Sequence, residues 1–174
     1  DVRWDPSRGQ IAAAGLDGVD AVIHLAGSSV AERWTAATKA EILSSRVQGT
    51  RLISESLARM AVKPEVLVCA SGIGIYGSRG EEWLDETSSH GADFLAEVGE
   101  AWEAATAPAR DAGIRVVLAR TGIVLNPSGG ALAKMLTPFR LGAGGRLGSG
   151  QQWMSWVSRE DYVGAVHHAL QTPG

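Results

Sequence analysis

Three short runs of apolar, mostly β-branched residues place the strongest constraint on the fold of this chain. They are Ala21–Leu25 (AVIHL), Val66–Ala70 (VLVCA) and Ile114–Ala119 (IRVVLA). Near-continuous apolar runs of this length are typical of strands that are buried on both faces of a parallel sheet. The runs begin about 45 residues apart. This spacing is too long for hairpins and leaves room for a crossover helix in each gap.

The gaps between these runs carry helical patterns. The first predicts a helix from Ala36 to about Met60, because its apolar residues recur at helical spacing and Pro64 closes it. The second predicts a helix from a cap at Asp93 to about Ala112, which Pro108 should kink or divide. Four further elements are expected: a short strand at Val2–Trp4, a helix at Ala131–Arg140, a strand at Trp153–Val157, and a helix from Ser158 to about Leu170.

Alternating strands and helices with buried strands indicate an α/β fold with a doubly wound, mostly parallel sheet. The length of 174 residues fits a single domain, residues 1–174, with one core. Sheets of this kind bind ligands outside the carboxyl ends of their strands. The segments that follow the three runs are rich in Gly and Ser, and they are the expected binding region: Ala26–Val30, Ser71–Gly80 and Thr121–Gly130.

Charge and composition exclude several classes of function. With 16 Lys and Arg against 19 Asp and Glu, the chain lacks the basic footprint of a nucleic-acid-binding protein. No apolar stretch is long enough to span a bilayer, so no membrane partner is expected. Cys69 is the lone cysteine, and no Cys/His cluster suits zinc, so we expect neither a disulfide nor a metal site. A reducing compartment follows, most simply the cytoplasm.

Several polar residues have a structural interpretation and a functional one. Gly72–Gly77 (GIGIYG) matches the G-x-G-x-x-G pattern of a pyrophosphate loop, but no helix pattern opens at once after it. A demanding turn at a strand end is therefore the better interpretation. His24 ends a strand and is expected to be a hydrogen-bonded structural histidine rather than a base. Glu97, Glu100 and Glu103 share one helix and are expected to form a solvated face.

The order of motifs resembles the short-chain dehydrogenase/reductase superfamily, extended type, from its fourth strand onward. The segments that carry the resemblance are Asp20–Gly27 (DAVIHLAG), Ser45–Leu52 (SRVQGTRL), Ala70–Gly77 (ASGIGIYG), Arg120–Val124 (RTGIV) and Trp156–Asp161 (WVSRED). The segment Met135–Gln151 (MLTPFRLGAGGRLGSGQ) is similar to one atypical subgroup, the epimerase family proteins. The resemblance covers essentially all 174 residues and implies a Rossmann-like domain that binds NADP, with NAD as the alternative.

Two departures from the superfamily pattern stand out. Nothing corresponds to the first strand and its glycine turn, and members continue beyond the position of Gly174, so the chain resembles a fragment that lacks the first strands and a C-terminal segment. The Tyr-x-x-x-Lys dyad falls in a frame where Phe94 holds the Tyr place and Val98 holds the Lys place. Phe has no hydroxyl to transfer a proton, and Val carries no charge to assist it.

The resemblance implies an NADP-dependent oxidoreductase or nucleoside-diphosphate-sugar epimerase-like enzyme, in which groups outside the dyad move the proton. The alternative is a catalytically inactive NADP-binding sensor or scaffold protein. The implied catalytic residues are Tyr76 and Ser71, and the implied cofactor-binding residues are Leu25, Ala26, Gly27, Glu41, Arg46, Thr121 and Val124. The implied partner is a small-molecule substrate, with a sugar nucleotide as one candidate, and a homodimer is left open.

Overall fold

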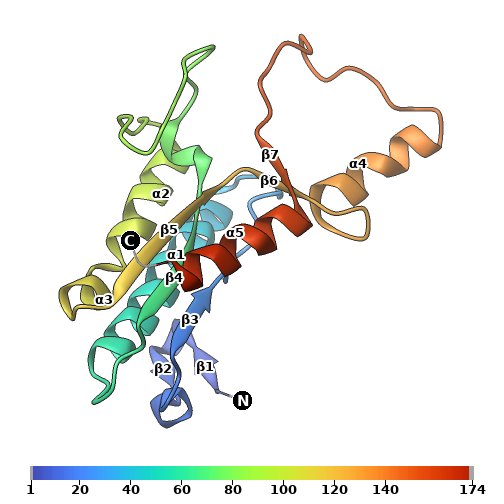
Figure 1. Ribbon diagram of the computed structural model, residues 1–174. Helices are drawn as coiled ribbons and strands as arrows, with labels where there is room; N and C mark the ends of the chain where they lie inside the picture. The colour runs from blue at the N-terminus through green and yellow to red at the C-terminus, as the bar shows by residue number, and fades with distance from the viewer. Residues whose placement is uncertain (1, 173–174) are drawn as a thin grey trace.

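A computed structural model describes residues 2–172 of the chain and is built around three parallel strands. They are β3 (Ala21–His24), β4 (Val66–Gly72) and β5 (Arg115–Thr121), and they lie in the order β3-β4-β5 (Figure 1). Val22 pairs with Leu67, and Leu67 in turn pairs with Val116. The fold class predicted from the sequence, an α/β fold with a mostly parallel sheet, is confirmed.

Both crossover helices begin at polar caps, and the sequence predicts the cap of the second. Helix α1 spans Ala36–Ala58, and the side chain of Thr35 accepts a hydrogen bond from the Thr38 amide at its N-terminus. The second crossover is divided into α2 (Phe94–Ala104), which Asp93 caps, and α3 (Ala107–Asp111). Pro108 lies in the first turn of α3, where its missing N–H leaves no bond unmade, so it divides the predicted helix as expected.

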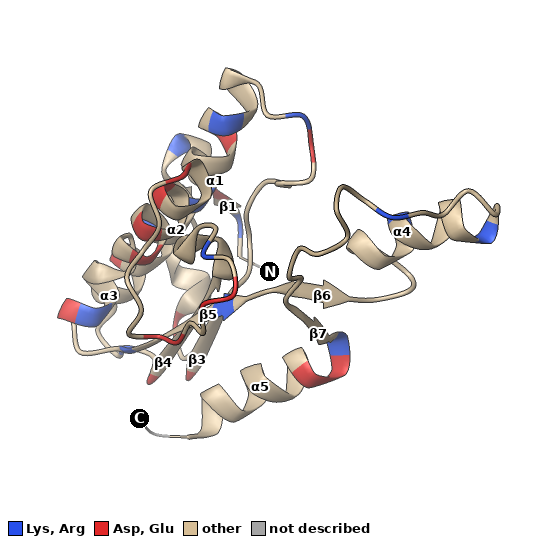
Figure 2. Ribbon diagram, turned by 90° about the horizontal axis from the view of Figure 1, so that it is seen from above, with Lys and Arg blue, Asp and Glu red and all other residues tan. Residues whose placement is uncertain are grey.

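Helices cover the two faces of the sheet. Figure 2 shows α1, α2 and α3 on one side of the strands and α5 (Arg159–Gln171) on the other. On the first side, Leu57, Leu67, Ala109 and Ile114 form a buried apolar cluster. On the second side, the guanidinium of Arg115 donates a hydrogen bond to the carbonyl of Leu170 near the end of α5. The two helical layers therefore pack on opposite faces of the sheet.

The remaining elements are short. They are β1 (Trp4–Asp5) and β2 (Gln10–Ile11), which form an antiparallel pair, β6 (Ile123–Leu125) and β7 (Trp156–Ser158), which form a parallel pair, helix α4 (Gly130–Arg140), and the 3-10 helices η1 (Pro6–Arg8), η2 (Ala13–Leu16) and η3 (Ile73–Tyr76). Figure 1 shows α4 and the segment after it extending away from the sheet. None of the helices within residues 2–172 is long and apolar enough to cross a membrane.

Three sequence predictions need correction. The strand expected at Val2–Trp4 is found at Trp4–Asp5, and the one expected at Trp153–Val157 at Trp156–Ser158. Strand β3 is not buried on both faces, because Ile23 is 46% exposed. Among the described strands, β3 pairs only with β4, so one of its edges has no neighbour. Burial on both faces is confirmed for β4, whose residues Val66–Cys69 are all buried.

Candidate functional site

The carboxyl ends of the strands bring most of the predicted cofactor residues to one edge of the sheet. Leu25, Ala26 and Gly27 follow β3 directly, and Leu25 is 53% exposed although it is apolar. Thr121 ends β5 and pairs with Gly72 at the end of β4. Val124 lies one element further on, in β6, where it pairs with Val157. The edge therefore combines exposed apolar surface with glycine backbone, which suits the approach of a flat ring.

The loop after β3 is held in place by two further predicted residues, Glu41 and Arg46 of α1. The Ser28 hydroxyl donates to Oε1 of Glu41 over 2.9 Å. Nη1 of Arg46 donates to the Ser28 carbonyl over 2.9 Å, and its guanidinium lies 4.9 Å from the Trp102 ring centroid. Burial lowers the pKa of Arg46 from its ordinary value. Both side chains therefore fix the loop that forms one wall of the edge.

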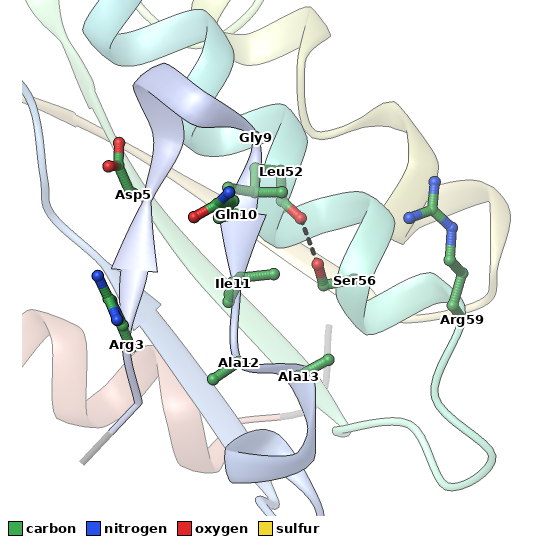
Figure 3. A pocket seen from close by; sticks show the side chains of 10 residues that line it. All are labelled: Arg3, Asp5, Gly9, Gln10, Ile11, Ala12, Ala13, Leu52, Ser56 and Arg59. Atoms are coloured by element: carbon green, nitrogen blue, oxygen red, sulfur yellow. Dashed lines mark hydrogen bonds between the residues drawn. The ribbon is translucent and has the colours of Figure 1, made fainter.

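Two hollows in the surface of the described residues differ in character. A small one, of about 130 Å³, lies between the loop after β3 and the first turns of α1, and Ser28, Thr38 and Glu41 line it. A larger one, of about 560 Å³, lies between the β1–β2 hairpin and the last turns of α1 (Figure 3). Because α1 runs back from the carboxyl edge, the larger hollow lies away from that edge, and of the two it is the small one that adjoins the candidate site.

A buried polar chain lies beneath the edge. Nε1 of Trp102 donates to the Thr50 hydroxyl over 2.9 Å, and that hydroxyl lies 3.0 Å from Nε2 of His24. An indole N–H can only donate, so Thr50 accepts from Trp102 and can give its own proton to a neutral imidazole. His24 is 3% exposed, and burial lowers its pKa to about 4. The interpretation of His24 as a structural histidine agrees with these contacts.

We expect the protein to lose stability in mild acid because of His24. Its pKa is 6.5 in ordinary surroundings and about 4 in the fold, so below pH 6.5 the unfolded chain binds the proton more readily. The free energy of unfolding should fall by about 2 kcal/mol between pH 7.5 and 5, and by about 3 kcal/mol at pH 4. Urea unfolding at each pH measures this loss.

His24→Gln should remove this loss between pH 7.5 and 5, whereas the matched variant His167→Gln, on the exposed side of α5, should keep it. If the free energy of unfolding of His24→Gln falls with pH as steeply as that of the native protein, other groups cause the acid sensitivity.

The two predicted catalytic residues, Ser71 and Tyr76, meet in one buried network. The Ser71 hydroxyl donates to Oε1 of Glu103 over 2.6 Å. Arg120 donates to both carboxylate oxygens of Glu103 over 2.8 Å, and its Nη1 donates to the Tyr76 hydroxyl oxygen over 3.0 Å. The same Nη1 donates to the carbonyl of Glu86 in the loop before α2, over 3.2 Å. The network joins β4, β5, α2, η3 and this loop.

Electrostatics stabilise the ion pair at the centre of this network. Burial alone would raise the pKa of Glu103, but hydrogen bonds from Arg120 and Ser71 outweigh it and hold the pKa below its ordinary value. The hydrogen bond to Glu103 raises the pKa of Arg120. Glu103 is 8% exposed, so the expectation that it lies on a solvated face is wrong, whereas Glu97 and Glu100 are exposed as expected.

The residues in the dyad frame contribute packing. Val98 is 3% exposed within the core side of α2. Phe94 packs edge-on against Trp34, with ring centroids 5.3 Å apart, and the ammonium of Lys39 lies 4.8 Å from its ring centroid. Neither Phe94 nor Val98 carries a group that can give or take a proton.

The G-x-G-x-x-G match does not open an α-helix. Gly72 ends β4, the 3-10 helix η3 follows at once, and Gly77 has a left-handed φ of 68°. Gly77 and Gly91 touch across the loop, because a Cβ on Gly91 would lie 2.8 Å from the Cα of Gly77. The next α-helix begins only at Phe94. The interpretation as a strand end with a demanding turn therefore agrees with the structure.

Comparison with known proteins shows that the chain is similar to several epimerase family proteins. The model of the NAD dependent epimerase/dehydratase family matches residues 5–174. The chain is 43% identical to epimerase family protein Mb2239 of Mycobacterium bovis over 99% of its length and 57% of that protein's. It is 37% identical to epimerase family protein YfhF of Bacillus subtilis, again over 99% of the chain and 57% of the relative. The chain thus spans little more than half the length of these curated relatives.

Solved structures agree with this placement. A nucleoside-diphosphate sugar epimerase from Corynebacterium glutamicum is similar with a TM-score of 0.84 and 40% identity, covering 97% of this chain and 35% of that one. Human epimerase family protein SDR39U1, solved with NADPH, is similar with a TM-score of 0.85 and 35% identity, covering 92% of this chain and 56% of that one. From its strand order, its carboxyl-edge loops and these matches, the chain belongs to the NAD dependent epimerase/dehydratase family.

Proposed function

We propose that the full-length protein is an NADP-dependent oxidoreductase or a nucleoside-diphosphate-sugar epimerase-like enzyme. The observation that carries this proposal is the carboxyl edge of the sheet, where the exposed Leu25 and Gly27 follow β3 and Thr121 ends β5, with the end of β4 between them. Membership of the family supports a nicotinamide cofactor, and the NADPH with which the human relative was solved supports NADP, with NAD as the alternative. When bound, the nicotinamide supplies the hydride acceptor or donor.

The residues of the edge fit the ring and ribose parts of such a cofactor. Gly27 lets the backbone after β3 pack closely on the Arg46 side chain, because a Cβ there would lie 3.2 Å from Cζ of Arg46. We propose that Leu25, Ala26 and Gly27 line the adenosine side, with Glu41 and Arg46 in weaker contact with ribose or phosphate, and that Thr121 and Val124 lie near the nicotinamide. Arg46 and Glu41 act on the cofactor mainly through the Ser28 loop that they hold.

Gly27→Val in the full-length protein should weaken NADPH binding by about tenfold or more. The branched side chain would displace Arg46 from the Ser28 carbonyl and raise the backbone that faces the cofactor. Isothermal titration calorimetry with NADPH measures the change. The control is Gly164→Val on α5, since a Cβ there meets nothing within 4 Å. Unchanged affinity in Gly27→Val would contradict this placement of the cofactor.

A polypeptide of these 174 residues should bind NADPH weakly or not at all. A pyrophosphate usually rests on amides at the N-terminus of a helix that a glycine turn opens. Within residues 2–172, Gly72–Gly77 instead encloses the 3-10 helix η3 and is followed by a polar loop rather than by an α-helix. Fluorescence titration with NADPH checks this expectation. Micromolar affinity would overturn it and would make Gly72–Gly77 a phosphate loop.

We propose that the proton chemistry uses Tyr76, with Ser71 beside it, on a small-molecule substrate of the sugar-nucleotide class. Tyr76 accepts a hydrogen bond from Arg120, and within residues 2–172 no acceptor takes its own proton. The name of the similar Corynebacterium glutamicum protein, a nucleoside-diphosphate sugar epimerase, supports a sugar nucleotide. Incubating the full-length protein with NADPH or NADP and a panel of sugar nucleotides and simple carbonyls tests the proposal. Nicotinamide absorbance and chromatography of the sugars are the readouts.

The second candidate function is a catalytically inactive NADP-binding sensor or scaffold. Two observations favour it: Phe94 and Val98 contribute only packing, and the Ser71 proton is committed to Glu103. Tight NADPH binding without turnover on any substrate of the panel would select this candidate. In either case we propose a cytoplasmic protein, since the given sequence holds one cysteine, Cys69, and so no internal disulfide, and a homodimer is the assembly to test by light scattering.

A further inference from the structure

We propose that Arg120, held by Glu103, is the positioning residue of the Tyr76 hydroxyl, and that it supplies the cation that a lysine supplies in the superfamily dyad. The inference rests on the proposed function, because it assigns a role within the same site. It concerns residues that the sequence pattern does not single out for chemistry, since that pattern puts Glu103 in solvent and gives Arg120 only a place in a strand-end motif.

The fork of hydrogen bonds fixes the guanidinium in one orientation. Nε and Nη2 of Arg120 each donate to one carboxylate oxygen of Glu103 over 2.8 Å. Such a two-point contact sets the plane of the guanidinium as well as its position. The third nitrogen, Nη1, is thereby directed at the Tyr76 oxygen and the Glu86 carbonyl. A lysine ammonium offers no rigid fork, so it could not contact both the Glu103 carboxylate and the Tyr76 hydroxyl in this geometry.

The hydroxyl of Tyr76 is left with a proton to give. Its oxygen accepts from Arg120 over 3.0 Å, and the guanidinium carbon lies 5.3 Å from the ring centroid. Because the cation occupies one side of the oxygen, the hydroxyl proton must point elsewhere. Within the described residues no protein atom accepts it. Ser71 differs, because its proton already goes to Glu103 over 2.6 Å, so Tyr76 is the side chain of the two that can donate.

The same cation also holds the loop before α2. Its contact with the Glu86 carbonyl ties this loop, which runs from Gly77 to the cap at Asp93, to the end of β5. Close approach of Gly91 to Gly77 closes the base of the loop. Tyr76 therefore lies between a fixed cation and a fixed loop, and its hydroxyl has little freedom to turn. This restraint is what a positioned proton donor requires.

A double-mutant cycle between Arg120 and Tyr76 tests the inference in the full-length protein. Arg120→Lys keeps the charge but loses the fork, and we expect kcat to fall about 100-fold with KM and NADPH affinity nearly unchanged. In a Tyr76→Phe background the same substitution should lower kcat no further, since Arg120 acts through the hydroxyl. Equal losses of kcat in both backgrounds would overturn the inference. Arg110→Lys on α3 is the matched control and should leave kcat unchanged.

A second measurement needs no turnover. In protein labelled with ¹³C at tyrosine Cζ, Tyr76→Phe identifies the Tyr76 signal, and Arg120→Lys should move that signal while Arg110→Lys should not. If Arg120→Lys leaves the chemical shift of the Tyr76 signal unchanged, the inference that Arg120 positions the hydroxyl is wrong, whether or not the enzyme is active. A signal that moves, in a protein that turns over no substrate, would support the contact and reject the proposed function instead.

Discussion

Replacing Tyr76 by Phe and Ser71 by Ala together in the full-length protein should lower turnover by roughly 10² to 10⁴. Positioned proton transfer contributes that range, and the double variant removes both hydroxyls from the end of β4 and from η3. Affinity for NADPH should stay unchanged, because neither side chain lies among the residues proposed to hold the cofactor. Steady-state kinetics on the most reactive substrate of the panel, with calorimetry for NADPH, measures both quantities.

The single variants separate the two hydroxyls. Tyr76→Phe should carry nearly the whole loss of turnover, because its proton has no acceptor among the described residues. Ser71→Ala should chiefly lower stability, by about 1 kcal/mol or more, because it removes a hydrogen bond to the buried Glu103 carboxylate. If turnover is unchanged in the double variant, the proton donor lies elsewhere and this site assignment fails.

The sheet could be predicted because its strands are near-continuous apolar runs, with helical patterns in the gaps between them. The three apolar runs became β3, β4 and β5, and the caps expected at Asp93 and Ser158 both begin helices in the structure. The burial of β3 could not be predicted, because a run of apolar residues does not tell how many neighbours a strand has. Ile23 remains 46% exposed, since only β4 pairs with β3 in the described residues.

The short strands β6 and β7 were predicted only in part, for a different reason: a strand was expected at Trp153–Val157, where β7 is Trp156–Ser158, and none was expected at Ile123–Leu125. Strands β6 and β7 have three residues each, too few for a periodic pattern, and they form because their chains pair with one another. The packing of Gly122 depends on the same approach, since a Cβ there would lie 2.6 Å from the carbonyl oxygen of Ser155. A contact between residues so far apart in the chain leaves no trace in local composition.

The candidate site was predicted in part. Leu25–Gly27 and Thr121 lie at the expected edge because the carboxyl ends of parallel strands must meet there. Glu103 was missed, although a signal exists. Glu103 lies at helical spacing from three buried residues, Ala96, Gly99 and Thr106. Glu97 and Glu100 lie on the exposed side of the same helix. A glutamate among such buried residues requires a cation, and Arg120 at the end of β5 provides it.

Removing one partner of the buried ion pair should be more damaging than removing both. Glu103→Leu leaves the Arg120 guanidinium, whose side chain is only 17% exposed, without its counter-charge, and should lower the free energy of unfolding by about 3 to 5 kcal/mol. Glu103→Leu with Arg120→Met and Ser71→Ala removes the charges and the stranded hydroxyl together, and should regain most of that loss. Urea unfolding at pH 7 measures both variants.

The pH dependence gives the same pair an independent check. The pKa of Glu103 lies below its ordinary value of 4.5 in the fold, so its contribution to stability is present above pH 4.5 and is lost as the pH falls through the lowered pKa. The triple variant should therefore lose less stability than the native protein below pH 4.5, while the His24-dependent loss between pH 7.5 and 5 stays the same in both. A triple variant as unstable as Glu103→Leu would show that the network stabilises the fold through its geometry rather than through the compensation of buried charge.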